Sequence, residues 1–128
     1  MKFLGVTPVL RMFDEQKARQ FYVEWLGFHV DFEHRFEANM PLYLGLSLGE
    51  IQLHLSEHHG DGSPGANVRI ECDDLDGFHK ELSHKGYKFY RPAIRDTEWG
   101  TREMRVQDGF GNSITFWAPK AATPASPE

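Results

Sequence analysis

The chain has 128 residues and a formal net charge of -5, which suits one domain of ordinary size with a sizeable core. Its only cysteine, Cys72, excludes an intramolecular disulfide and fits a reducing compartment. Acidic and basic residues are interspersed, which disfavours a nucleic-acid partner, and no run approaches the roughly 18 apolar residues of a membrane span. We therefore expect a cytoplasmic protein with no nucleic-acid or membrane partner.

The first half of the chain is predicted to form a strand, a helix and three further strands. Residues 6–12 are strand-like, and Asp14 then precedes apolar residues at helical spacing that end at Gly27. The later strands are predicted over about residues 28–36, 42–48 and 51–55. Gly49 and Glu50 form a predicted hairpin connection.

The second half repeats this scheme. Residues 68–72 are strand-like, Asp73 or Asp74 precedes a second helical pattern, and Gly86 ends it. The strands that follow are predicted over about residues 88–94, 101–107 and 113–118. Two glycines and an asparagine within residues 108–112 predict a tight turn between the last two.

Side chains sort onto the two faces of each predicted strand by alternation. Residues 42–48 carry leucine at every even position, so Tyr43 is expected on the opposite face, and the same rule places His54 there on the next strand. Trp117 is expected on the corresponding face of the last strand, and Phe32 and Phe36 share one face of the second strand.

The two halves are expected to form one domain over residues 1–119, with modules at about residues 5–57 and 66–119. A linker rich in Gly, Ser and Pro covers residues 58–65. Residues 120–128 have no apolar periodicity, which predicts a flexible C-terminal tail.

The βαβββ order, found twice, resembles the vicinal-oxygen-chelate superfamily, which includes glyoxalase I, extradiol dioxygenases and bleomycin resistance proteins. Among these groups the chain looks most like the bleomycin resistance proteins. The strings that carry the resemblance are Pro8-Val9-Leu10-Arg11, Ala18-Arg19-Gln20-Phe21-Tyr22, Leu26-Gly27-Phe28, Leu53-His54-Leu55-Ser56 and the segment from Trp99-Gly100 to Phe116.

The resemblance implies an α+β fold in which two βαβββ modules form curved mixed sheets around a concave cavity. It also implies a homodimer in which two chains complete each cavity. Pro8 suits an edge or exchanged strand because proline cannot donate to a central ladder, so the N-terminal strand is a candidate for exchange between subunits.

Metalloenzymes of the superfamily take their ligands from the first and last strand of each half. Matching the motifs residue by residue puts Thr7, His54, Asn67 and Thr115 at those places. Only His54 is a competent ligand, whereas a protein-bound transition metal typically wants at least three His or carboxylate donors. The sequence therefore predicts no metal, no cofactor and no catalytic residue, unless Glu71 or Glu103 reaches across to complete a set.

What remains is a binding cavity lined by rings and acids. Trp99 matches the loop aromatic of the bleomycin resistance proteins and offers a flat ring beside Gly100 for stacking. Glutamates at the rim, Glu103 among them, are expected to attract a cationic tail. The predicted ligand-binding residues are Trp99, Phe36, Phe32, His54, Glu103, Trp117 and Tyr43.

These features predict a metal-independent protein that sequesters bleomycin-type antibiotics, or a similar cationic aromatic molecule, and so confers antibiotic resistance by binding. Two alternatives stay open. One is a metal-dependent enzyme of the same superfamily, a glyoxalase-like lyase or a dioxygenase, and the other is a binding module for an unrelated metabolite, because a fold does not fix a function.

Overall fold

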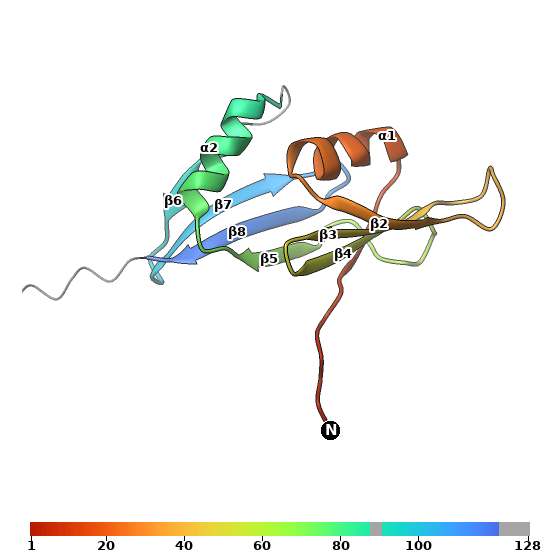
Figure 1. Ribbon diagram of the computed structural model, residues 1–128, viewed down its shortest axis with the longest axis horizontal. Coiled ribbons are helices and arrows are strands. Elements are labelled where there is room, and N and C mark those ends of the chain that lie inside the picture. The colour runs from red at the N-terminus through yellow and green to blue at the C-terminus, as the bar shows by residue number, and fades with distance from the viewer. Residues whose placement is uncertain (88–90, 121–128) are drawn as a thin grey trace, which may run out of the picture. The chain divides into compact units, whose positions relative to one another are not determined.

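The computed structural model describes residues 1–87 and 91–120. The chain folds into two compact units, one made of residues 1–67 and 107–113, the other of residues 68–106 and those from 114 on. Each unit carries a four-stranded sheet and helical turns (Figure 1), so the predicted α+β order of strand, helix and three strands, repeated once, is confirmed.

The first sheet has the strand order β1-β4-β3-β2. Strand β1 runs parallel to β4, whereas β3 is antiparallel to both of its neighbours, which makes the sheet mixed. The bounds are β1 (Val9–Arg11), β2 (His29–His34), β3 (Tyr43–Leu48) and β4 (Ile51–Ser56).

The second sheet has the order β5-β8-β7-β6. Ser113 N donates to Ala66 O, and Cys72 N donates to Trp117 O. Residue numbers therefore increase in the same direction along both strands, so β5 and β8 are parallel. The bounds are β5 (Asn67–Glu71), β6 (Ile94–Asp96), β7 (Thr101–Gln107) and β8 (Ser113–Pro119).

Aspartates cap both helices, as the sequence predicts. The Asp14 carboxylate accepts from Lys17 N at the start of α1 (Glu15–Ala18), and Asp74 rather than Asp73 caps α2 (Leu75–Lys85) by accepting from Gly77 N. Helix α2 ends at Gly86 in the left-handed conformation, which favours glycine.

The first helix continues as a π-helix, η1 (Arg19–Trp25), whose last turn is closed by a hydrogen bond from Leu26 N to Phe21 O. The spacing of apolar residues does not distinguish this wider helix from an α-helix over so few residues. Its rings pack on one another, with the Phe21 centroid 4.8 Å from that of Tyr22 and 5.5 Å from that of Trp25.

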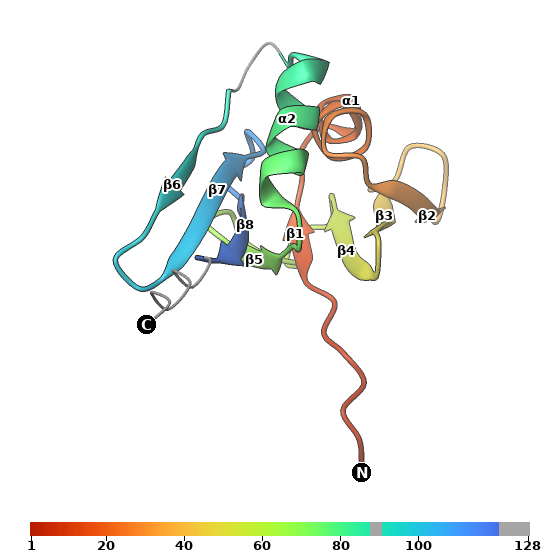
Figure 2. The ribbon, with the colours of Figure 1, turned by 60° about the vertical axis from the view of Figure 1, so that its left-hand side comes forward.

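Each helix lies over one face of the sheet of its own unit (Figures 1 and 2) and leaves the opposite face without a helix. In the first unit the covered face is apolar, since Leu44, Leu46, Leu53 and Leu55 are all buried. In the second unit the Phe78 ring of α2 contacts Phe116 of β8 at 4.8 Å between centroids. We call the opposite face of each sheet its open face.

Two predicted strands begin several residues later in the structure than the sequence indicates. Strand β1 begins at Val9 rather than at residue 6, because Pro8 has no N–H with which to continue the ladder. Strand β6 covers residues 94–96 instead of 88–94, and Pro92 accounts for the late start in the same way; residues 88–90 lie outside the described residues. The predicted tail lies outside them too, apart from Lys120.

The turn over residues 108–112 joins β7 to β8 but packs into the first unit. The buried Asp108 carboxylate accepts from Tyr22 Oη at 2.6 Å, from the N atoms of Phe110 and Asn112, and from Asn112 Nδ2. Asn112 Nδ2 also donates to Arg11 O. Burial and the Asp108 charge together raise the pKa of Tyr22, so its hydroxyl stays protonated and donates.

No helix within the described residues is long and apolar enough to cross a lipid bilayer.

Replacing Tyr22 by Phe removes one donor to a buried carboxylate and leaves the ring in place. We expect Tyr22→Phe to lower the free energy of unfolding by about 1.5–3 kcal/mol, as measured by urea denaturation. The matched control is Tyr43→Phe, whose hydroxyl is only partly buried. An equal loss for both variants would contradict the role assigned to Asp108.

Candidate functional site

The open face of the second sheet is organised around the Glu103 carboxylate. Glu103 is only 4% exposed and accepts from Arg69 Nη1 at 3.2 Å, from Arg69 Nη2 at 2.7 Å and from Thr101 Oγ1 at 2.7 Å. The indole Nε1 of Trp99 donates to the same carboxylate at 3.3 Å. One carboxylate thus holds a ring, a guanidinium and a hydroxyl in fixed positions.

These contacts favour the charged form of Glu103. The hydrogen bonds from Arg69 lower the pKa of Glu103 to about 2; burial opposes the shift, and the hydrogen bonds from Thr101 and Trp99 add to it. The same pairing raises the pKa of Arg69. Glu103 is therefore a bound anion, and its charge is compensated before any ligand arrives.

The Trp99 ring stands on an ordered loop. Thr97 N donates to Thr101 O at 2.9 Å, and Lys120 N donates to Gly100 O at 2.8 Å. Gly100 has a φ of 90°, a conformation that other residues rarely adopt, which explains a glycine directly after the ring. Trp99 is nevertheless 66% exposed, so a large flat surface is held in place yet open to solvent.

Trp117 lies on the same face, one strand away from Glu103. The Arg69 guanidinium carbon lies 5.5 Å from the centre of the Trp117 ring, and Arg69 reaches Glu103 across β8. Trp99, Trp117 and Glu103, three of the predicted ligand-binding residues, therefore form one cluster with Arg69. We call these four residues the indole platform.

Three other predicted residues form a second cluster, on the open face of the first sheet. The Phe32 ring stacks on Tyr43 with centroids 6.2 Å apart and meets His54 edge-on at 5.3 Å. Phe32 lies directly over Gly45, where any Cβ would collide with the ring, and it is still 45% exposed. We call Phe32, Tyr43 and His54 the phenyl platform.

A β-bulge places Phe32 on this face. The pairing of β2 with β3 shifts between Val30, which opposes Leu46, and Phe32, which opposes Gly45. Strict alternation would put Val30 and Phe32 on the same face, so the bulge moves Phe32 to the open one. Phe36 lies beyond the end of β2, is 73% exposed and packs its ring on His34 at 5.0 Å.

Tyr43 and His54 are joined by a hydrogen bond of 2.7 Å between Tyr43 Oη and His54 Nδ1. Burial, with a contribution from the charge of Asp61, raises the pKa of Tyr43, so the phenol is protonated and donates to the ring nitrogen. This arrangement fixes the orientation of the imidazole at the edge of the phenyl platform.

The four positions implied as metal ligands do not make a metal site. Thr7, Asn67 and Thr115 offer only hydroxyl or amide oxygens, and His54 Nδ1 is bonded to Tyr43. Among residues 1–87 and 91–120, no three His, Cys, Asp or Glu side chains converge as a metal would require. Glu103, one of the two carboxylates considered for completing the set, is bound by Arg69, Thr101 and Trp99.

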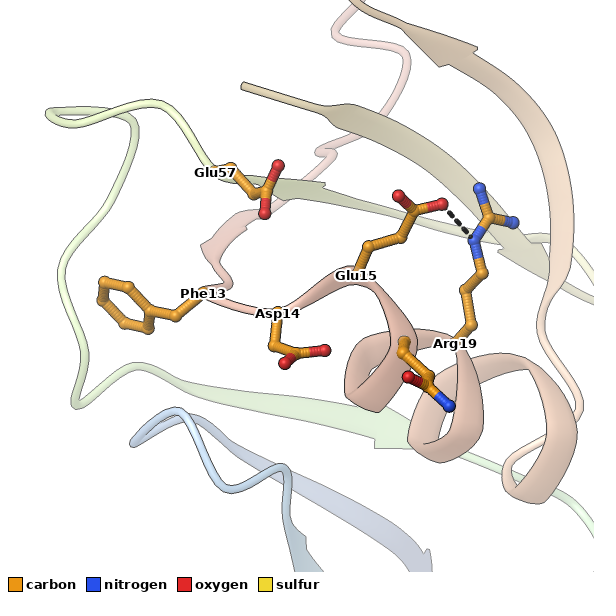
Figure 3. A pocket seen from close by; sticks show the side chains of 6 residues that line it. Phe13, Asp14, Glu15, Arg19 and Glu57 are labelled. Carbon is orange, nitrogen blue, oxygen red and sulfur yellow. Dashed lines mark hydrogen bonds and ion pairs between the residues drawn. The ribbon is translucent and has the colours of Figure 1, made fainter. Parts of the chain in front are cut away.

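A hollow of about 550 Å³ lies elsewhere in the first unit, at the start of α1 (Figure 3). Its charged groups are already engaged: Glu15 pairs with Arg19 at 2.9 Å and with Arg35 at 2.6 Å, and Glu57 accepts from Leu42 N. None of the predicted ligand-binding residues lines it, so we place the candidate site on the open faces of the sheets.

Comparison with known proteins then shows the family. A family model described as "Glyoxalase superfamily protein" matches residues 1–122. The chain belongs to the glyoxalase superfamily. The resemblance inferred from the sequence is thereby confirmed. One relative is the uncharacterized protein YetH of Bacillus subtilis (strain 168). It is 28% identical over 117 residues, which cover 88% of this chain and 94% of YetH.

Solved structures share the fold. TnmS3, an antibiotic binding protein from Streptomyces sp. CB03234, matches with a TM-score of 0.68 and 23% identity over 93% of this chain and 98% of TnmS3. A bleomycin-binding protein solved in complex with bleomycin matches with a TM-score of 0.64 and 21% identity over 91% of this chain and 98% of its own. This glyoxalase superfamily chain therefore has the fold of proteins that bind antibiotics.

Sequence reasoning missed Arg69 as a member of the site. Alternation places it on the same face as Trp117, but its pairing with Glu103 depends on β8 inserting between β5 and β7, and no local pattern shows that strand order. Gly45 was missed for a similar reason. A side chain at position 45 would collide with the ring of Phe32, which lies opposite on the neighbouring strand, and local sequence does not show this pairing.

Replacing Glu103 by Gln should change the acid stability of this glyoxalase superfamily protein. The pKa of Glu103 is about 2 when folded, against an ordinary 4.5, so its stabilising contribution is full above about pH 4.5 and is lost as the pH falls through 2. We expect the free energy of unfolding to fall more steeply between pH 4.5 and 2 in the wild type than in Glu103→Gln, as followed by urea denaturation at each pH.

Thr101→Val keeps the Arg69 pair and should retain a steep, though smaller, dependence on pH. Identical slopes for the wild type and Glu103→Gln would show that this carboxylate is not held as described.

Proposed function

We propose that this protein binds a flat aromatic small molecule on the open faces of its sheets and holds it without chemical change. The observation that carries the proposal is Trp99, which is 66% exposed and fixed at its indole nitrogen by Glu103. An ordered, exposed ring costs little conformational entropy when a ligand stacks on it. The two platforms hold six of the seven predicted residues, and Phe36 stays a predicted contact.

The chemistry of the platforms supports binding rather than turnover. Glu103, with its lowered pKa and its hydrogen bonds from Arg69, Thr101 and Trp99, is a weak base. Cys72 is half-buried, and burial raises the pKa of its thiol, which disfavours the nucleophilic thiolate. The groups that are fixed in position are thus engaged with one another and suit a preorganised binding surface.

Bleomycin-type antibiotics are the first candidate ligands, and sequestration in the cytoplasm would make binding alone sufficient for antibiotic resistance. Two proteins with this fold support the choice by what they bind: one is a bleomycin-binding protein and the other an antibiotic binding protein. Of the glutamates expected to attract a cationic tail, Glu103 and Glu33 are paired with Arg69 and Arg19. Affinity should therefore come mainly from stacking.

Removing the Trp99 ring should weaken this binding. We expect Trp99→Ala to lower the affinity for metal-free bleomycin by about fivefold, corresponding to ~1 kcal/mol of aromatic stacking, as measured by isothermal titration calorimetry. The control Trp99→Phe keeps an aromatic face and should retain most of the affinity. Absence of saturable binding to the wild type at micromolar bleomycin would refute bleomycin as the ligand.

We further propose that the protein is a homodimer joined by its N-terminal arm, residues 1–8. The arm extends away from the first unit (Figures 1 and 2), and Phe3, Leu4 and Val6 on it are each at least 90% exposed. Pairing of β1 with β4 begins at Val9 and His54, so residues 51–53 of β4 come before the start of β1 in this parallel pair. An apolar arm beside a strand edge suits exchange with a second copy.

Sedimentation velocity tests this assembly. We expect the full chain to sediment as a dimer at micromolar concentration and the triple variant Phe3→Ser, Leu4→Ser, Val6→Ser to shift toward monomer, because the arm would lose most of its apolar contact area. A monomeric wild type would overturn the proposal, as would a variant that dimerises equally well.

A further inference from the structure

The β-bulge in β2 places a carboxylate on the same face as the Phe32 ring. Because the pairing with β3 shifts between Val30 and Phe32, Asp31 is the extra residue of the bulge. The Asp31 carboxylate accepts from Ser47 Oγ at 3.0 Å, and Ser47 alternates with the leucines of β3, so it lies on the open face of the first sheet. Two consecutive residues, Asp31 and Phe32, therefore lie on this open face.

The charge of Asp31 is available to a ligand. Its Oδ1 atom accepts from Ser47 Oγ and from His29 Nδ1, both at 3.0 Å, whereas its Oδ2 atom accepts no hydrogen bond from a described residue. These hydrogen bonds, that from His29 first, lower the pKa of Asp31 against the opposing effect of burial. Among residues 1–87 and 91–120 no Lys or Arg pairs with Asp31, whose side chain is 39% exposed. Asp31 thus differs from Glu103, which Arg69 neutralises.

The phenyl platform supplies aromatic rings near this charge. The centroids of the Phe32 and Tyr43 rings lie 6.2 Å apart, the rings are within 13° of parallel, and Phe32 is 45% exposed. His54 also contributes to the lowered pKa of Asp31, which puts the platform within electrostatic reach of this carboxylate. Ring faces attract cations and a carboxylate forms charge-assisted hydrogen bonds with them, so the two together favour a bound ammonium group.

Two further charged residues on this side of the first unit offset each other. Arg11 of β1 lies on the open face by alternation, but its guanidinium carbon lies 4.7 Å from the centre of the Phe13 ring. The Asp61 carboxylate accepts from Ser56 Oγ, and Ser56 is the register partner of Arg11 on β4. Asp61 therefore lies at the Arg11 end of the face and opposes its charge, and Asp31 stays uncompensated.

The remaining charged residues of this unit do not neutralise Asp31 either. Two exposed acids lie in its loops, Glu37 after β2 and Glu50 between β3 and β4, and they add negative charge. The open face of the first sheet thus favours a cation. The other cations of the unit are Lys2 on the N-terminal arm, Lys17 on α1, Arg19 on η1, which pairs with Glu15 and Glu33, and Arg35, which pairs with Glu15.

We infer that Asp31 and the phenyl platform bind the positively charged group of an aromatic ligand, an ammonium or a similar organic cation. The cation lies against the Phe32 ring and pairs with Asp31, and the flat part of the ligand stacks on exposed rings. The inference rests on the proposed binding function. It assigns the cationic part of the ligand to an aspartate, for which the sequence suggested glutamates.

The test uses two tricyclic probes of nearly equal shape, cationic 9-anthracenemethylammonium and neutral 9-anthracenemethanol. We expect the wild type to bind the ammonium about fivefold more tightly than the alcohol, as measured by titration of the anthracene fluorescence. The titrations are run at pH 7.5, because protonated imidazoles on this face would compete with the probe for Asp31. The preference should shrink as NaCl is raised, because exposed charges are screened.

Variants locate the preference. Asp31→Asn keeps the size of the side chain and removes its charge, and it should reduce the preference for the ammonium to about twofold or less. Phe32→Leu keeps an apolar side chain over Gly45 but removes the ring face, and it should reduce the preference by about half. Glu24→Gln is the matched control: it removes the same charge from the exposed side of η1, which covers the other face of this sheet, and should leave the preference in place.

The outcomes separate this inference from the proposed function. Equal binding of the two probes, or tighter binding of the alcohol, overturns the inference and leaves aromatic binding standing. No saturable binding of either probe overturns both. A preference for the ammonium that survives in Asp31→Asn, or that falls equally in Glu24→Gln, also overturns the inference, because it would not arise from this carboxylate.

Discussion

The indole platform depends on one buried carboxylate. Glu103 accepts hydrogen bonds from Arg69, Thr101 and Trp99, and each of these contacts fixes a group that would otherwise move freely at the surface of a sheet. A buried carboxylate is stable only when its charge is compensated, so Arg69 cannot leave without a large cost. Glu103 is therefore best understood as a residue that positions an aromatic surface, and its own charge is not available to a ligand.

A second constraint makes such surfaces possible. Each four-stranded sheet has one helix to cover it, so each exposes one face to which no helix of its own unit contributes. Both open faces carry rings instead of a purely polar surface: Trp99 and Trp117 in one unit, Phe32 and Tyr43 in the other. Large exposed rings in ordered positions are typical of surfaces that bind other molecules. Membership of the glyoxalase superfamily accounts for the repeated architecture, whereas the rings on the open faces are the features from which we propose a ligand.

The sequence predicted the repeated order of elements because its signals are local. Helix caps, glycine stops and alternation require only a few neighbouring residues, as Asp74, Gly86 and the leucines of β3 illustrate. Alternation also placed Tyr43, His54 and Trp117 on open faces. It did not reveal that Glu103 is buried and neutralised, because that depends on Arg69 reaching across β8. Local patterns likewise hid the bulge that turns Phe32 outward and the packing of the 108–112 turn against Tyr22.

The most direct test of a binding surface held by Glu103 follows the three tryptophan indole N–H signals by NMR during titration with a neutral flat aromatic such as 9-anthracenemethanol. Trp25 is 2% exposed and serves as the internal reference. We predict that the Trp99 signal moves saturably while that of Trp25 stays in place, and that the Trp99 response weakens in Glu103→Gln. A Trp99 signal that stays unchanged while the ligand binds elsewhere would contradict the account.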